Sequence, residues 1–184
     1  MRPNILFIMT DTQSANYIGC YGRPELQTPH LDDLANEGIR FDRAYTTCPV
    51  CSPARGAIFA GQMPSKAGPM TNNLALFQDV YHMGQYFSQQ QYYTAYAGKW
   101  HLDGHDYFGD GICPEGWDER YWYDGKCYLD ELEAESKTNG RDLIKLWRQE
   151  LKNTQQLKDE KITAGFTWGH RISDRILDCM ANRP

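Results

Sequence analysis

The sequence has no long apolar run. Residues 5–9 form the longest one, far short of the roughly 20 residues of a membrane helix and of the apolar region of about 7–15 residues in a signal peptide. Lys and Arg are not clustered, and the net charge of −5 disfavours nucleic acid or an anionic membrane as a partner. We therefore expect a soluble protein, cytoplasmic for the chain as given and periplasmic if a signal has been removed.

Glycosylation signals, internal repeats and low-complexity segments are also missing from the sequence. Its six cysteines include no second C-x-x-C pair, so a disulfide framework and a tetrahedral zinc site are both disfavoured. Free thiols in a reducing compartment are the expectation. The 184 residues, of which 41% are hydrophobic and 13% aromatic, are enough for one domain with a core.

Apolar patterning predicts strands that alternate with helices. Residues 4–10 are apolar on both faces, which is typical of a buried parallel strand. Thr28-Pro29 is a helix start and Gly38 is its stop. The same signals predict strands at 39–45 and 92–97, helices at 51–60, 83–91, 142–151 and 172–180, and a loop at 104–126. The fold class expected is α/β, a mostly parallel sheet flanked by helices.

Functional sites of parallel sheets gather where strands end, and Asp11 and Lys99 follow two predicted strands. A carboxylate at the end of a buried strand needs a partner, because burying it unpaired is costly. Asp11 is therefore a turn cap or a metal ligand, and the sequence leaves both interpretations open.

Cys51-Ser52-Pro53-Ala54-Arg55 forms a C-x-P-x-R string at a predicted helix start. The helix dipole favours a thiolate there, and Arg55 lies on the same helical face four residues on, so the pair predicts an anion-binding corner. Cys48 and Cys51 also form a C-x-x-C pair, which leaves a redox or zinc interpretation open.

Gly98-Lys99-Trp100-His101-Leu102 follows the predicted strand 92–97. Lys99 could supply positive charge to an anion, and His101 a proton or a hydrogen bond. His101 and His105 have the spacing of a helical metal pair, but Gly104 between them disfavours a helix. Six aromatic residues in and near the loop would stack on a sugar or pack locally, and packing is the more frequent role: Trp100, Tyr107, Phe108, Trp117, Tyr121 and Trp122.

Taken together, these strings resemble type I sulfatases of the alkaline phosphatase-like superfamily. The resemblance rests on residues 4–11, on Cys51-Ser-Pro-Ala-Arg55 and on Gly98-Lys-Trp-His101-Leu102, in that order, and extends to about residue 105. It implies that residues 1–184 are the N-terminal part of a sulfatase catalytic domain. The stretch that begins at His105 looks like a bacterial branch of the family.

The resemblance implies a mechanism for sulfate ester hydrolysis. A formylglycine-generating enzyme would oxidise Cys51 to formylglycine, and one hydroxyl of its hydrate would attack sulfur and displace the alcohol. Loss of the proton from the other hydroxyl would then expel sulfate. Ca²⁺, or Mg²⁺, would be held by Asp11, Thr12 and the modified Cys51. Arg55 would steady the formylglycine, Lys99 would hold sulfate, His101 would bond the nucleophile or the sulfate, and His105 would contact an aryl or carbohydrate sulfate.

Two departures from the family pattern are visible. Many sulfatases have two adjacent aspartates where this chain has Asp11-Thr12. Sulfatase catalytic chains are also more than twice as long, so the downstream site residues would come from a C-terminal half, and the isolated chain is expected to have little or no activity. The alternatives are a phosphatase or phosphodiesterase of the same superfamily, a non-enzymatic or redox module, and a catalytically dead homologue.

Overall fold

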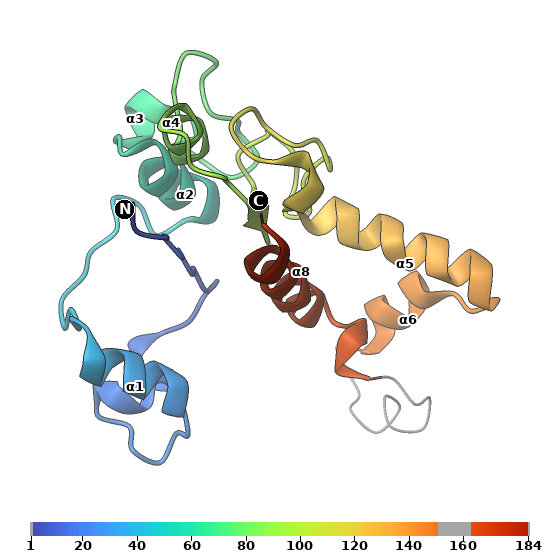
Figure 1. Ribbon diagram of the computed structural model, residues 1–184, viewed down its shortest axis with the longest axis horizontal. Coiled ribbons are helices and arrows are strands. Elements are labelled where there is room, and N and C mark those ends of the chain that lie inside the picture. The colour runs from blue at the N-terminus through green and yellow to red at the C-terminus, as the bar shows by residue number, and fades with distance from the viewer. Residues whose placement is uncertain (1, 151–162, 184) are drawn as a thin grey trace. The chain divides into compact units, whose positions relative to one another are not determined.

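The structure, a computed structural model, describes residues 2–150 and 163–183 (Figure 1). It consists of two compact units, Met1–Tyr45 and Thr46–Pro184, and each is described by itself below. In the described ranges no helix is both long and apolar enough to cross a membrane.

The first unit is held together by a small polar cluster between two short 3₁₀ turns, η1 (Ala15–Tyr17) and η2 (Gly19–Tyr21), and helix α1 (Pro29–Glu37). Thr28 precedes α1 as predicted, but its hydroxyl accepts a hydrogen bond from Gly19 N (2.8 Å) and donates one to Asp32 (3.1 Å). Asp32 also accepts from Cys20 N at 2.7 Å. The side chain that was expected to cap α1 therefore joins the helix to η2.

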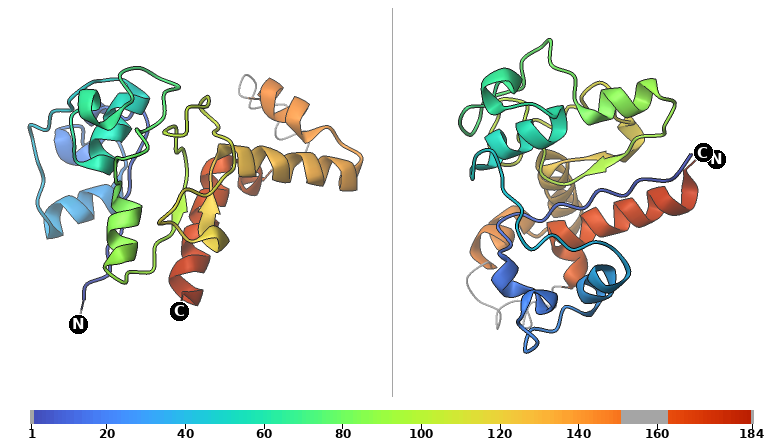
Figure 2. Two further views of the ribbon diagram at one scale, coloured as in Figure 1. Left: turned by 90° about the horizontal axis from the view of Figure 1, so that it is seen from above. Right: turned by 90° about the vertical axis from the view of Figure 1, so that its left-hand side faces the viewer.

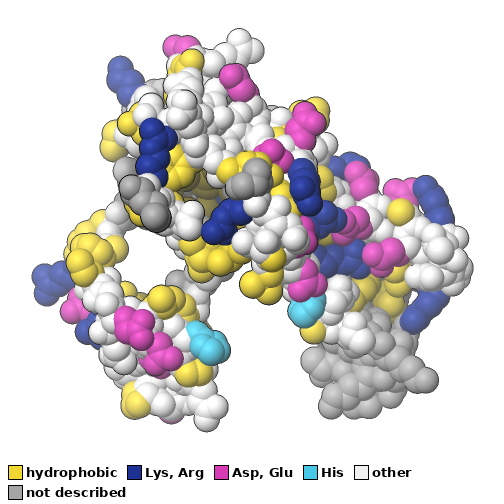
Figure 3. All heavy atoms as spheres, in the orientation of Figure 1, with side chains coloured by type: hydrophobic (Ala, Val, Ile, Leu, Met, Phe, Trp, Pro, Cys, Tyr) yellow, Lys and Arg dark blue, Asp and Glu magenta, His cyan; other side chains and the backbone are white. Residues whose placement is uncertain are grey.

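The two strands predicted in this unit are wrong. In the described structure residues 4–10 and 39–45 belong to no strand or helix, and Ile8 and Ile39 are 70% and 84% exposed. The predicted apolar face of α1 is uncovered too, with Leu34 at 62%, and Figure 3 shows hydrophobic side chains at the surface around α1. An apolar run becomes a strand only when a neighbouring strand pairs its N–H and C=O groups. The described part of this unit contains no strand beside these runs, and Phe41 O accepts instead from the Tyr21 hydroxyl at 3.1 Å.

The second unit contains a parallel sheet, which confirms the α/β class. Its strands are β1 (Tyr96–Ala97) and β2 (Trp122–Tyr123), with Tyr96 opposite Trp122. The predicted strand 92–97 is thus limited to its last two residues. The predicted loop 104–126 ends earlier, because η3 (Glu119–Tyr121), β2 and the start of helix α5 (Gly125–Asn139) all lie in it. Trp122, one of the six aromatic residues expected in or near the loop, is the first residue of β2.

The helices before the sheet agree with the sequence prediction. Helix α2 (Cys51–Ala60) begins at the predicted residue and ends before Gly61, whose φ of 63° is left-handed. A short helix, α3 (Pro64–Ala67), follows, and α4 (Met83–Gln89) ends two residues before the predicted end. Local start and stop signals were therefore sufficient for these helices.

Aromatic rings fill the space between α2, α4 and the sheet. Trp100 is 2% exposed, and its ring centroid lies 5.1 Å from Phe59 and 5.7 Å from Trp122. Tyr121 and Trp122 are also buried. The packing interpretation is confirmed for these three of the six aromatics, whereas Tyr107 remains 43% exposed.

Helices α5, α6 (Leu143–Glu150) and α8 (Trp168–Asn182) form the other half of the unit, with the short turn η4 (Ala164–Phe166) before α8 (Figure 2). Leu151, the predicted end of the helix 142–151, lies outside the described residues. Of the predicted apolar stripe on α8, Leu177 and Met180 are exposed, and Cys179 is the buried residue. The core here consists of Tyr123, Tyr128, Leu132, Leu143 and Leu146.

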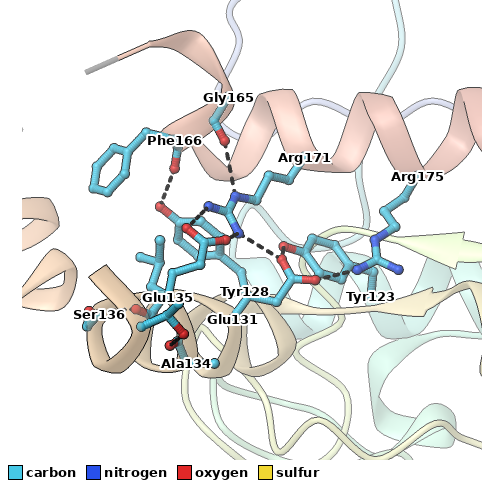
Figure 4. Close-up of polar contacts among 12 residues, drawn as sticks. Tyr123, Tyr128, Glu131, Ala134, Glu135, Ser136, Gly165, Phe166, Arg171 and Arg175 are labelled. Carbon is cyan, nitrogen blue, oxygen red and sulfur yellow. Dashed lines mark hydrogen bonds and ion pairs between the residues drawn. The ribbon is translucent and has the colours of Figure 1, made fainter. Parts of the chain in front are cut away.

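An ion-pair network joins α5 to α8 (Figure 4). Arg171 donates two hydrogen bonds to Glu135, at 2.8 and 2.9 Å, and one to Glu131 at 3.0 Å. Glu131 also accepts from the Tyr123 hydroxyl at 2.6 Å and from Arg175. Paired, two-pronged arginine contacts of this kind fix geometry as well as charge, so the network sets how α8 lies on α5.

This network predicts a pH dependence of stability. Burial opposes ionisation of Glu131, but hydrogen bonds from Tyr123 and Arg171 outweigh it and lower its pKa. A carboxylate with a lowered folded pKa stabilises the fold above its unfolded pKa, about 4.3, and that contribution is lost as the pH falls through the folded value. We expect Glu131→Gln to flatten the acid limb of stability against pH in urea titrations. Glu133→Gln, which alters an exposed i,i+4 pair with Lys137, is the control and should leave that limb unchanged.

Candidate active site

Cys51 is the first residue of α2, as predicted, and its side chain is half-buried. Val50 before it makes no side-chain cap, and the Ser52 N–H instead donates to Asn72 Oδ1 at 3.0 Å. All six cysteines lie in the described ranges and are free. Burial raises the pKa of Cys113 and Cys127 to about 11, which disfavours their thiolates.

Arg55 joins the two sequence motifs. Arg55 is buried, with 7% of the residue exposed, and its guanidinium donates to the carbonyl oxygen of Lys99. The Tyr96 hydroxyl donates to the same carbonyl and lies 3.5 Å from Arg55 Nη1. The guanidinium that the sequence predicts to bind an anion beside Cys51 therefore bonds the Lys99 backbone, forty-four residues further along the chain.

Lys99 and His101 follow β1 on a sharply turned segment. Gly98 has a φ of 129°, and its N–H donates to Tyr123 O at 2.7 Å, which continues the parallel pairing. Lys99 Nζ lies 4.3 Å from the centroid of the Tyr107 ring, a cation–π contact. His101 has a φ of 58° and is 3% exposed. Two of the predicted site residues are thus held in buried positions beside Arg55.

Burial and the nearby charges of Lys99 and Arg55 lower the pKa of His101. The ring is therefore neutral at neutral pH, with one donor nitrogen and one acceptor nitrogen. Its Nε2 lies 2.8 Å from Asn73 Oδ1, and its Nδ1 is buried without a hydrogen-bond partner among the described residues.

Asn72 and Asn73 are the residues that the sequence analysis missed. Asn72 bonds the start of α2 and Asn73 bonds His101, so one loop touches both motifs. Asn73 has a φ of 64°, a conformation that asparagine tolerates better than most residues. The only local signal was an Asn-Asn pair between two predicted helices, which is typical of any turn.

Asp11 and Thr12 lie in the first unit, and both are exposed. The Thr12 hydroxyl donates to Asp11 Oδ1 at 3.0 Å, and Thr12 has a φ of 59°. Adjacent carboxylate and hydroxyl oxygens are the donors that Ca²⁺ and Mg²⁺ prefer. The chemistry of this pair therefore fits the divalent cation that the resemblance implies.

His105 is the most exposed of the predicted site residues in the second unit, at 58% of its side chain. Its Nδ1 lies 3.7 Å from Asp110 and 4.0 Å from Asp103. Both carboxylates line a cavity of about 290 Å³, together with Trp100 and Leu102. Lys99 and His101 are not among the described residues that line it, so this cavity is separate from the buried contacts around Arg55.

Comparison with known proteins agrees with these features. The family model described as Sulfatase matches residues 3–176. The sulfatase YidJ of Escherichia coli is 50% identical over 177 residues, which cover 96% of this chain and 34% of that protein. An N-acetylglucosamine-6-O-sulfatase of Bacteroides thetaiotaomicron is 38% identical over 68% of this chain and 24% of its own length.

A solved structure described as a complex with its substrate D-glucosamine-2-N,6-O-disulfate matches with a TM-score of 0.57. It is 36% identical and covers 64% of this chain and 22% of that one. The chain therefore belongs to the sulfatase family, a family of sulfuric ester hydrolases, and the fold implied by the resemblance is confirmed. It spans about a third of the length of YidJ and about a quarter of the length of the N-acetylglucosamine-6-O-sulfatase.

Proposed function

We propose that this chain carries the nucleophile and part of the sulfate-binding site of a formylglycine-dependent sulfatase. The observation that carries the proposal is the hydrogen bond from Arg55 to the Lys99 carbonyl, because it joins the C-x-P-x-R helix start to the Gly-Lys-Trp-His segment. A redox role for Cys48 and Cys51 would give no reason for that connection. The family assignment also favours sulfate esters over phosphate esters.

Each site residue has a physical role in this proposal. Oxidation of Cys51 to formylglycine supplies, when formed and hydrated, a hydroxyl nucleophile beside a second hydroxyl that allows sulfate to leave. The start of α2 presents the positive potential of the helix dipole to an anion, while Ser52 N is bonded to Asn72 Oδ1 and Pro53 has no N–H. Lys99 adds a full positive charge, and Arg55 holds the Lys99 backbone in place. These groups stabilise the charge on the sulfuryl oxygens as it develops.

Asp11 and Thr12 would hold the divalent cation, Ca²⁺ or Mg²⁺, together with the modified side chain of residue 51. When bound, such an ion neutralises negative charge on the sulfate and favours the ionised form of a coordinated hydroxyl. Thr12 brings a neutral oxygen where many sulfatases have a second carboxylate, so the site carries one negative charge fewer.

The substrate class we propose is a carbohydrate sulfate, with aryl sulfates as the second class to assay. Support comes from the relative named N-acetylglucosamine-6-O-sulfatase and from the solved structure with bound D-glucosamine-2-N,6-O-disulfate. Because the chain spans about a third of YidJ, we propose that a C-terminal part supplies the remaining sulfate and cation ligands. His105 would contact the alcohol half of the ester from its exposed position. Maturation requires a formylglycine-generating enzyme as a partner.

The test is mass spectrometry of the residue 51 peptide after coexpression with a formylglycine-generating enzyme. Conversion of the thiol to the aldehyde should lighten the peptide by about 18 Da. Trypsin cleaves after Arg43 and Arg55, so Cys48 and Cys51 share one peptide and fragment ions must assign the change. We expect it at Cys51 alone, because Val50 replaces the required proline after Cys48. An unmodified Cys51, in cells that convert a known sulfatase, would refute the proposal.

A further inference from the structure

The ring of His101 is buried, and only one of its two nitrogens has a hydrogen-bond partner among the described residues. Nε2 lies 2.8 Å from the Asn73 amide oxygen, whereas Nδ1 is buried and without a partner among the described residues. Buried polar atoms are nearly always hydrogen-bonded, and an exception needs an explanation. A role for Nδ1 as the hydrogen-bond partner of a group that enters the site would explain why it has none here.

The identity of the Asn73 atom decides which nitrogen carries the proton. An amide oxygen only accepts, so Nε2 must be the protonated nitrogen and Nδ1 the one with a free lone pair. The hydrogen bond that one ring nitrogen makes thus sets the chemistry of the other. A neutral His101 in this tautomer accepts a hydrogen bond from a hydroxyl through Nδ1 and cannot donate one to a sulfate oxygen there.

Hydrogen bonds on both sides of Asn73 hold its loop in place. Before it, Asn72 Oδ1 accepts from Ser52 N at 3.0 Å. After it, Leu76 N donates to Leu102 O at 3.1 Å and Phe77 N to Ala67 O at 2.9 Å. Both Asn73 and His101 have left-handed φ values, 64° and 58°, which non-glycine residues rarely adopt. Such strain persists where the surroundings fix it, and it gathers at functional sites.

We propose that Asn73 is a positioning residue that holds His101 in the Nε2–H tautomer, so that Nδ1 serves as the hydrogen-bond acceptor for a hydroxyl at residue 51. This rests on the proposed function and decides between the two roles left open for His101. The ring bonds the nucleophile, and the sulfate oxygens are left to Lys99 and the start of α2.

The tautomer can be read directly on this chain by NMR, because the two ring nitrogens differ in ¹⁵N shift when only one is protonated. In the wild-type protein at alkaline pH, we expect a pyridine-like Nδ1 and a protonated Nε2 whose Hε2 signal is protected from solvent exchange. A pyridine-like Nε2 instead would mean that the Asn73 amide donates, and it would overturn the proposal.

Two variants of Asn73 separate the effect of its amide oxygen from the effect of its left-handed backbone conformation. Asn73→Gly keeps the left-handed conformation without strain but removes the acceptor. We expect the Hε2 signal to be lost and the two nitrogen shifts to move toward each other as both tautomers become populated. Asn73→Asp keeps an acceptor oxygen and should restore the wild-type pattern.

Asn4→Gly, an exposed position in the other unit, is the matched control and should change nothing. A Hε2 signal equally protected in Asn73→Gly would refute the positioning role. None of these readouts requires conversion of Cys51 or turnover of a sulfate ester. Failure of the tautomer assignment is therefore distinguishable from failure of the proposed function.

Discussion

Replacing Gly68 by alanine is expected to lower the free energy of unfolding by about 3 kcal/mol, the sum of backbone strain and overpacking. Gly68 has a φ of 121°, which side chains rarely adopt, and it lies where α3 meets the loop that carries Asn73. A Cβ there would stand 2.7 Å from Phe77 N and 2.8 Å from Ala75 O. Both are backbone atoms and cannot rotate away, so the loop itself must move.

Gly61→Ala is the matched control. Gly61 also has a positive φ, 63°, but a Cβ there meets nothing within 4 Å. Its expected cost is the left-handed penalty alone, about 1–2 kcal/mol. Urea or guanidinium titrations of both variants measure the difference. Equal losses would show that the close approach of the Gly68 and Phe77 backbones contributes nothing.

The Gly68 variant also has a consequence for the site. The loop that its Cβ would displace holds Asn72 on the start of α2 and Asn73 on His101. We expect the His101 Hε2 signal to broaden or disappear in Gly68→Ala and to persist in Gly61→Ala. Loss of the signal in Gly68→Ala alone would show that the close backbone approach at Gly68 holds Asn73 on His101.

Local sequence signals predicted α2 well, but they gave no helix at α3 or α5. Cys51 was expected at the start of α2 and Gly61 after its end, and both positions are as expected, because capping and glycine stops act within a few residues. The strands were predicted poorly. Residues 4–10 have strand composition, but a strand exists only where another pairs with it, and composition does not reveal the partner.

The residues of the proposed site could be named from the sequence, but their connections could not. Cys51, Arg55, Lys99 and His101 come from two strings, and the structure joins those strings through the Lys99 carbonyl, to which Arg55 and Tyr96 both donate. Nothing in the strings indicates that Arg55 would bond a backbone atom and not an anion directly. The asparagine that bonds His101 comes from a loop whose position depends on close backbone packing at Gly68, and this is a tertiary effect.

Asp124→Ala is expected to cost about 2–4 kcal/mol of stability, since loss of a cap costs about 0.5–2 and each buried partner left unpaired about 1–3. Asp124 is fully buried. Its Oδ1 accepts from Cys127 N at 2.9 Å and caps α5, and its Oδ2 accepts from Gly111 N at 2.9 Å. One carboxylate thus starts a helix and fastens the loop that follows the Gly-Lys-Trp-His segment.

Denaturant titration of two further variants shows how much of the lost stability comes from the helix cap and how much from the bond to Gly111. Asp142→Ala removes an exposed aspartate that bonds Lys145 N at 2.8 Å near the start of α6, and about 1 kcal/mol is expected for a cap alone. Asp124→Asn should fall between the two, because its amide keeps one acceptor and turns an N–H toward the second donor. If Asp124→Ala cost no more than Asp142→Ala, the bond to Gly111 would contribute nothing. The loop would then depend on its glycines and aromatic contacts for its shape, and the carboxylate would matter only to the helix.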